Sequence, residues 1–399
     1  MRKLNKTAAC GILAAALAAG TLSGCSKAID GTKTVATVGD EKVTLGLASY
    51  MTRDQQAQTM SYYNMLMSQY GVSGSASNVW DQKGDDGKTV GENSKDSVMK
   101  TINQLYVLKA HAADYDVTIT EDEEKAIKEA AAEFIKDNDE KILKKLAVSE
   151  DDIVTYLELV TIRSKMHDPM TADVDTEVSA NEKDQTRVTI VKVSTEGTEK
   201  DDDGNTIDLT DEEKAQKKDL AQQVLDKVKA SDDVANADMD ALAKEVDDSL
   251  SATAPAFTTA GDTDDTLDEA VQDAALELKD GEVADKVIEG DDGYYVVRLD
   301  KMLDEDATEN KEKTVISERK SDLYDSTLED WVKEEKIKVK DKVWDQITVT
   351  DSVSFVYKSA DSSDDTESSD AQDSTEDTSS QDNSEDTTTE DAAAEDSAE

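Results

Sequence analysis

The chain has 399 residues, of which 93 are acidic and 44 are basic, so its formal net charge at pH 7 is -49. This acidity excludes nucleic acid as an expected partner, because phosphate binding needs a basic surface, and it argues against electrostatic attraction to an anionic membrane. His111 and His167 are the only histidines, so we expect no metal site and no cofactor. The length predicts two or three domains, since a domain usually takes about 100–200 residues.

Residues 1–24 have the pattern of a secretory signal peptide. Basic residues near the start precede an apolar, alanine-rich stretch at residues 8–20, which is too short to span a bilayer, since spanning needs about 20 residues. The stretch leads into the sequence LSGC at residues 22–25, which resembles the bacterial lipobox. This resemblance implies cleavage before Cys25, lipid attachment to Cys25, and a protein anchored to the outer face of a bacterial cell membrane. The alternative is an ordinary signal peptide followed by an incidental cysteine.

A helical segment is predicted over residues 35–173, after a linker of residues 25–34. It begins with β-branched residues around Gly39-Asp40, which predict a hairpin over residues 35–44. The run from Leu47 to Tyr70 contains no glycine or proline and predicts a long helix.

The rest of this segment is predicted to contain a loop and further helices. Residues 71–92 are polar and include glycines, which predicts a loop, and a helix resumes over residues 95–113. A capping-box sequence at Thr120 begins the next helix. Ser149 caps another helix, which we expect to end at residues 167–169, the sequence HDP.

The first long helix carries an uncharged group of methionine and tyrosine residues. Methionine surfaces adapt to varied partners, so some of these side chains are candidates for contact with client proteins. Core packing is the alternative, and we expect it for most of the group. The group consists of Met51, Met60, Met65, Met67, Tyr50, Tyr62, Tyr63 and Tyr70.

Residues 185–303 change character and predict a small α+β domain, because strands begin and end the segment and helices fill its middle. The first strand is rich in β-branched residues, and a capping sequence at Thr210 begins the first helix. The expected elements, in order, are a strand at residues 187–194, helices at residues 211–230, 239–246 and 267–278, and a strand at residues 293–299.

Residues 309–358 predict a helix that includes Leu328 and Trp331, followed by a β-prone end. Residues 359–399 consist almost wholly of Ser, Thr, Asp, Glu and Ala, with 16 acidic residues and no basic ones. We predict that they are disordered, because such a sequence cannot bury a core. A spacing or weakly cation-binding tail and simple solubility are both open as its role.

Three segments in the middle of the chain resemble motifs of parvulin-type peptidyl-prolyl isomerases. Residues 242–249 resemble the helix-to-loop signature, residues 276–283 resemble the "ALKxGEV" turn, and residues 292–299 resemble the final strand. They occur in the family's order, between helical segments and after a lipobox. The chain therefore resembles the extracytoplasmic foldase lipoproteins of the PrsA and SurA type.

This resemblance implies an α+β fold of two parts. Residues 35–173 and 309–358 would form one helical chaperone domain, similar to those of SurA and trigger factor. Residues 185–303 would form a parvulin-like domain inserted between these segments. The implied partners are unfolded or newly exported proteins, and nothing in the sequence indicates an oligomeric state.

The same resemblance names a candidate catalytic residue. Parvulins use an acidic or cysteine side chain together with two histidines, and the acid position matches Asp248. The histidine positions fall on Val188 and Tyr295, and no histidine follows His167. Tyr295 can donate a hydrogen bond and Val188 cannot, so Asp248 lacks the partners that the family provides. The alternative for Asp248 is an acid exposed to solvent in the loop after a helix.

The proline-binding pocket of parvulins is apolar, and the resemblance gives its positions here. Leu267 and Val271 take two of them, although the family usually has an aromatic residue at the position of Val271. Phe257 is close enough in sequence to compensate in part, and Tyr295 completes the candidate substrate-binding set.

The implied function is that of a membrane-anchored extracytoplasmic chaperone that assists the folding of secreted proteins. Peptidyl-prolyl isomerase activity is expected to be weak or absent, because both family histidines are missing. The alternative is a non-catalytic surface lipoprotein that retains the foldase fold and binds one partner. Suppressed aggregation of unrelated proteins would indicate the chaperone, whereas a single saturable partner would indicate the alternative.

Overall fold

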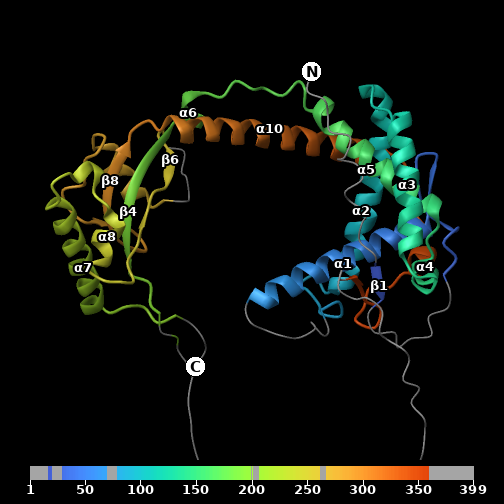
Figure 1. Cartoon of the computed structure of the whole chain (residues 1–399), viewed down its shortest axis with the longest axis horizontal. Coiled ribbons are helices and arrows are strands. Elements are labelled where there is room, and N and C mark those ends of the chain that lie inside the picture. The colour runs from blue at the N-terminus through green and yellow to red at the C-terminus, as the bar shows by residue number, and fades with distance from the viewer. Residues whose placement is uncertain are drawn as a thin grey trace, which may run out of the picture. The chain divides into compact units, whose positions relative to one another are not determined.

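The computed structural model describes residues 17–19, 29–69, 79–198, 200, 206–260 and 267–358. Cys25 and the acidic segment at residues 359–399 lie outside these residues, so lipid attachment and the nature of the tail stay predictions. In the described part of the chain, no helix combines the length and the apolar character needed to cross a membrane. Most of the described elements are helices, with one larger sheet in the middle of the chain (Figure 1).

The hairpin predicted near the start is present, and a strand from the other end of the chain extends it. Strands β2 (Thr34–Val38) and β3 (Glu41–Thr44) pair antiparallel. Gly39 between them has a φ of +56°, in the left-handed region that glycine enters at no steric cost. Strand β9 (Ile337–Val339) pairs antiparallel with β2. The C-terminal segment thus joins the N-terminal segment in one sheet, a pairing that the sequence analysis did not predict.

A series of helices follows the hairpin, and most begin at a strong cap. Three of the caps are reciprocal capping boxes, in which a Thr or Ser hydroxyl accepts from a backbone N–H and the acid three residues on accepts from the cap's N–H. The helices are α1 (Leu45–Gln69), α2 (Val90–His111), α3 (Glu121–Asp137), α4 (Glu140–Leu146) and α5 (Glu150–Met170), with a short 3-10 helix, η1 (Ala112–Tyr115), after α2.

Helix α2 begins earlier than the sequence predicted. Thr89 and Glu92 form a capping box, with the Glu92 side chain accepting from the Thr89 N–H at 2.8 Å, inside a stretch whose glycines indicated a loop. The helix therefore starts at Val90 instead of residue 95. Helix α4 was not predicted, although Asp139 caps it by accepting from the Lys141 N–H at 2.6 Å.

Helix α5 also differs from the prediction, because it continues through Pro169 to Met170 instead of ending at residues 167–169. Proline removes one hydrogen bond from a helix interior. Here it lies in the last turn, and the Thr171 N–H still closes the helix by donating to the His167 carbonyl oxygen at 3.2 Å.

The C-terminal segment begins with a long helix, α10 (Glu305–Glu334), four residues before the predicted start, because Asp304 caps it by accepting from the Ala307 N–H at 2.7 Å. Helix α11 (Asp341–Trp344) and strand β10 (Phe355–Tyr357) follow β9, and β10 pairs with β1 (Leu17–Ala19). Apolar residues of this segment enter the same buried core as the N-terminal helices. They include Leu328, Trp344, Ile347 and Phe355.

The middle of the chain forms a separate sheet with helices on both faces, as the predicted α+β domain requires (Figure 1). Its strand order is β5-β4-β8-β7, and β6 also pairs with β4. The strands are β4 (Gln185–Ser194), β5 (Ala252–Thr253), β6 (Ala256–Thr258), β7 (Ile288–Glu289) and β8 (Gly293–Lys301). The helices are α6 (Ala180–Lys183), α7 (Asp211–Lys229), η2 (Val234–Asn236), α8 (Met239–Lys244) and α9 (Glu269–Leu276).

Alternation along the two central strands divides the core of this domain into two layers, because successive strand residues point to opposite faces. One layer, beneath α7 and α8, contains Val191 and Val296. The other, beneath α9, contains Val188, Tyr295 and Val297. The residues that the sequence predicts to form the pocket belong to the second layer.

Candidate functional site

The four predicted substrate-binding residues lie together in the layer beneath α9. Strand β6 supplies Phe257, the residues just before α9 supply Leu267, α9 supplies Val271, and β8 supplies Tyr295. Val188, which the sequence resemblance assigns to the position of a family histidine, belongs to the same cluster. Phe257 and Val271 are 0 % exposed, so among the described residues these side chains pack against one another as a core layer.

The hydroxyl of Tyr295 is already engaged inside the protein. It donates to Asp292 Oδ1 at 2.5 Å, and the Lys192 ammonium also pairs with Asp292. Burial raises the pKa of Tyr295, and the adjacent Asp292 carboxylate raises it further through the hydrogen bond and its charge. Burial opposes ionisation of Asp292, but the hydrogen bonds from Lys192 and Tyr295 outweigh it and lower the pKa of that carboxyl. The phenol therefore stays protonated and directed at a neighbouring carboxylate.

Asp248 lies in the loop after α8 and is exposed to solvent. The turn is held by its neighbour Asp247, which accepts from the Ser249 N–H at 2.8 Å and from the Ser249 hydroxyl at 2.6 Å. The residues on either side of this turn, Val246 and Leu250, pack in the layer beneath α7 and α8. The fold thus gathers the four predicted pocket residues in one layer and anchors the turn that carries Asp248 in the other.

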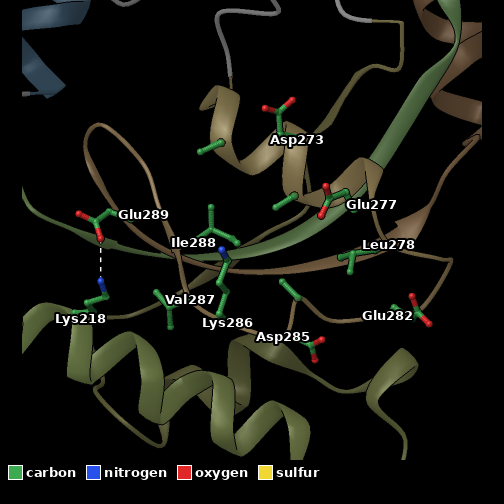
Figure 2. Close-up of a pocket in the computed structure, with 13 residues that line it drawn as sticks. Lys218, Asp273, Glu277, Leu278, Glu282, Asp285, Lys286, Val287, Ile288 and Glu289 are labelled. Atoms are coloured by element: carbon green, nitrogen blue, oxygen red, sulfur yellow. Dashed lines mark hydrogen bonds and ion pairs between the residues drawn. The ribbon is translucent and has the colours of Figure 1, made fainter.

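A cavity of about 790 Å³, which the sequence did not indicate, lies between α7 and α9. Figure 2 shows Lys286, Val287 and Ile288 between the two helices, with Glu282 toward one end and an ion pair between Lys218 and Glu289 at the other. The Lys218 Nζ and Glu289 Oε2 atoms are 2.9 Å apart. Helix α9 faces the cavity with one side and the core with another. Its cavity-facing residues are Ala270, Asp273 and Ala274, followed by Glu277 just after the helix, and its core-facing residues are Val271 and Ala275.

The lining of this cavity combines an apolar floor with a mostly acidic rim. Alanine and aliphatic side chains of α9, of β7 and of the segment between them form the floor, and one of the two lysines, Lys218, is neutralised by its partner Glu289. A concave surface of this kind fits an apolar group that carries positive charge. The acidic residues of the lining are Asp273, Glu277, Glu282, Asp285 and Glu289.

The methionine and tyrosine group on α1 is divided along the helix. Tyr50, Met51 and Met60 are buried where α1 packs against α2, α5 and β10. The core packing expected for most of the group is thus found for three of its seven described members. Beyond Met60 the side chains emerge, and Tyr62 is 63 % and Met65 64 % exposed. Tyr63 and Met67 are half-buried, and Tyr70 lies outside the described residues. The C-terminal end of α1 is therefore a second candidate site, with an apolar and uncharged surface.

Both histidines contact α10. The His111 ring stacks on Trp331 with ring centres 4.0 Å apart, and His111 is only half-exposed. The His167 ring lies 5.5 Å from the ring of Tyr324 and is exposed. His167 is therefore a surface residue, whereas His111 forms part of the contact between α2 and α10.

Comparison with known proteins identifies the middle domain. Residues 200–314 match the PPIC-type PPIASE domain, a match that covers α7 to β8 and the first turns of α10. The comparison with curated proteins gives no match. The predicted parvulin-type segment is therefore confirmed.

Solved structures similar to this chain include foldases named PrsA. The foldase protein PrsA from Lactococcus lactis is 14% identical, with 78% of this chain and 96% of that chain covered and a TM-score of 0.33. The peptidylprolyl isomerase PrsA from Bacillus cereus is 19% identical, with 67% and 96% covered and a TM-score of 0.29. PrsA from Bacillus subtilis is 16% identical, with 63% and 89% covered and a TM-score of 0.21.

Proposed function

We propose that this chain is an extracytoplasmic chaperone of the foldase type, held at the outer face of the membrane by lipid on Cys25. Its helical domain binds unfolded exported proteins. Its parvulin domain is a binding or spacing module with weak or no isomerase activity. Support comes from the matched domain family, from the helical domain built by both ends of the chain, and from the lipobox sequence.

We infer the low isomerase activity mainly from the packed layer of side chains beneath α9. Rotation about a prolyl peptide bond faces a barrier of about 18–20 kcal/mol, and an enzyme lowers it by binding the twisted amide better than the planar one. That requires an apolar space for the prolyl ring and a polar group directed at the amide. Here Phe257 and Val271 fill the space, and the Tyr295 hydroxyl is held by Asp292.

Candidate residues keep limited roles in this proposal. Asp248 is an exposed loop acid, and neither of the two positions at which the family has a histidine holds one here. Asp248 therefore contributes little to catalysis. Phe257, Leu267, Val271 and Tyr295 stabilise the domain by packing. Contact with unfolded proteins falls to surfaces such as the exposed end of α1, where Tyr62 and Met65 offer uncharged, adaptable side chains.

A protease-coupled proline isomerisation assay, run beside an aggregation assay on two unrelated unfolded proteins, tests the proposal. We expect suppressed aggregation of both proteins together with isomerase activity at least about a hundredfold below that of an intact parvulin, the scale of one positioned acid–base group. An intact parvulin domain is the positive control for the first assay. Isomerase activity within tenfold of that control would contradict the proposed loss of catalysis.

The cavity between α7 and α9 favours a second candidate, a surface lipoprotein that retains the foldase fold and binds one partner. A concave site with an apolar floor and a few placed charges is typical of one defined ligand. Binding that saturates with a single partner, combined with no suppression of aggregation for unrelated proteins, would favour this candidate over the chaperone.

A further inference from the structure

Strand β10 has its pairing partner in a part of the chain that the sequence assigns to the secretory signal. In the described residues, β10 pairs with β1 alone, antiparallel and with Leu17 opposite Tyr357. Residues 17–19 lie inside the apolar stretch that precedes the lipobox. Cleavage before Cys25 would therefore remove β1 and leave the edge of β10 without a partner.

The contacts of Leu17 show what that edge offers to a peptide. The Leu17 side chain is buried in the core of the helical domain. Its backbone N–H donates to Asn138 Oδ1 at 3.0 Å, while Asn138 Nδ2 donates to the Phe134 carbonyl oxygen at 2.8 Å. Asn138 is 7 % exposed, so its amide oxygen is a buried acceptor that loses its partner when β1 leaves, and an unmet buried acceptor is costly.

Strand β10 is held in place by contacts with helix α1. Phe355 is buried, and the Arg53 guanidinium lies 5.1 Å from the centre of its ring. The Tyr357 hydroxyl donates to Asp54 Oδ1 at 3.1 Å. Since both anchoring residues belong to α1, β10 is fixed by contacts that do not involve β1, and its free edge stays ordered enough to receive another strand.

We propose that residues 355–357 together with Asn138, here called the β10 strip, dock one extended apolar segment of an unfolded exported protein. The chain's own Leu17–Ala19 fills the strip until the leader is removed, so the precursor is closed and the mature protein open. This deepens the proposed chaperone function and rests on it for the identity of the partner.

An apolar segment is the occupant that these contacts favour. Pairing with a strand edge uses the backbone of the bound peptide, so it tolerates many sequences, as a binder of varied clients needs. Asn138 accepts a hydrogen bond from a backbone N–H, which any peptide offers, and the site that the Leu17 side chain occupies requires only an apolar group. The segment seen on the strip comes from a leader rich in alanine and leucine, which is the composition expected of the occupant.

The test uses the full chain and the variant Leu17→Asp, in which a buried carboxylate drives β1 off the strip. The probe is a fluorescein-labelled peptide with the sequence of residues 11–22, followed by fluorescence anisotropy. We expect the Leu17→Asp chain to bind it at least about tenfold more tightly than the unmodified chain, in which β1 competes. Adding Asn138→Ala should weaken binding about fivefold through the lost hydrogen bond.

Hydrogen exchange supplies a readout at the strip itself. In the Leu17→Asp chain, exchange at residues 355–357 should be faster than in the unmodified chain, and the peptide should slow it again. Circular dichroism confirms that the variant is folded. Leu303→Asp, at a leucine that is already exposed, is the matched control and should leave both readouts unchanged.

Three outcomes would overturn the docking strip. They are equal peptide affinity with and without Leu17→Asp, protection by the peptide at amides other than residues 355–357, and concentration-dependent dimers of the variant that protect the strip without peptide. Aggregation suppression, measured on the same samples, separates the two proposals. Protection at the strip without suppression rejects the chaperone function alone, and suppression without protection rejects the docking strip alone.

Discussion

The sequence resemblance places Tyr295 at the position of a parvulin histidine, and the surroundings of its phenol differ from what an imidazole in that role would need. An imidazole can donate and accept near neutral pH. The Tyr295 hydroxyl instead donates to Asp292, and burial together with that carboxylate raises its pKa. The residue therefore contributes to stability more than to chemistry.

Tyr295→Phe separates these two roles, since it removes the hydroxyl and keeps the ring. We expect a loss of about 1 kcal/mol in the free energy of unfolding, because Asp292 loses one hydrogen bond but keeps the Lys192 ammonium. Any residual isomerase activity should stay unchanged. Denaturant unfolding and the coupled isomerisation assay measure the two effects, and Tyr62→Phe, at an exposed tyrosine, is the control. A tenfold fall in isomerase activity would show that Tyr295 is catalytic.

The sequence predicted four pocket residues as neighbours, and their role in binding substrate stays a prediction. The resemblance placed Phe257, Leu267, Val271 and Tyr295 in one site, and the fold does bring them together. Whether such residues line a space or fill it depends on how β6, α9 and β8 pack, which is a tertiary property. The cavity between α7 and α9 escaped prediction for the same reason, since its ion pair joins Lys218 to Glu289 across two distant segments.

At the scale of elements, local signals predicted helix starts well where a cap lies within a few residues. The Thr120 and Ser149 caps needed only neighbouring residues and were found. The start of α2 was misplaced because glycines upstream outweighed the capping box at Thr89. The end of α5 was misplaced because Pro169 indicates a helix end, whereas a proline in a last turn leaves most hydrogen bonds intact.

Helix α10 begins at a residue that also fastens it to the parvulin sheet. Asp304 caps the helix through the Ala307 N–H and forms an ion pair with Arg187 of β4. The hydrogen bond from the Ala307 N–H and that from Arg187 hold the pKa of Asp304 below its ordinary value. The stabilisation by the Asp304 carboxylate is therefore fully present above the pKa that this carboxyl has in the unfolded chain. It is lost as the pH falls through the lower pKa of the folded state.

Asp304→Asn keeps a side-chain oxygen for the cap and removes the charge. At pH 7 we expect the variant to be about 1 kcal/mol less stable, which is the scale of a charge-assisted cap. The difference should shrink as the pH falls below about 4, the ordinary carboxyl pKa, because protonation then removes the charge from the unmodified chain as well. Urea unfolding at pH 7 and pH 3 measures it. Asp306→Asn, at an exposed residue of the same turn, should show no such convergence.

The exposed end of α1 is the element that we expect to contact clients. Replacing Tyr62 and Met65 together by serine should weaken aggregation suppression and leave the melting temperature unchanged, since both side chains are mostly in solvent. Met60→Ser is the matched core control, and it should lower stability by about 2–5 kcal/mol, as the loss of a buried methionine does. Full aggregation suppression by the double variant would exclude this surface from client binding.

At the scale of the whole molecule, the negative charge acts over the longest distances. Residues 359–399 hold 16 of the 93 acidic residues, so most of the negative charge lies on the rest of the chain, where the acid-rimmed cavity between α7 and α9 also lies. A lipid anchor on Cys25 would hold such a protein beside an anionic membrane that otherwise repels it. The negative electrostatic potential of the protein should also select among clients, by attracting basic chains and repelling acidic ones.

Salt dependence tests this selection. At low ionic strength we expect stronger aggregation suppression for a basic client than for an acidic client of similar size. The preference should fade toward 1 M salt, where the screening length drops to about 3 Å from about 10 Å at 0.1 M. Removing residues 359–399 should leave most of the preference, because the larger share of the acids remains. A preference that disappears with residues 359–399 would instead assign client selection to that acidic segment, and a preference that persists at 1 M salt would assign it to apolar contacts.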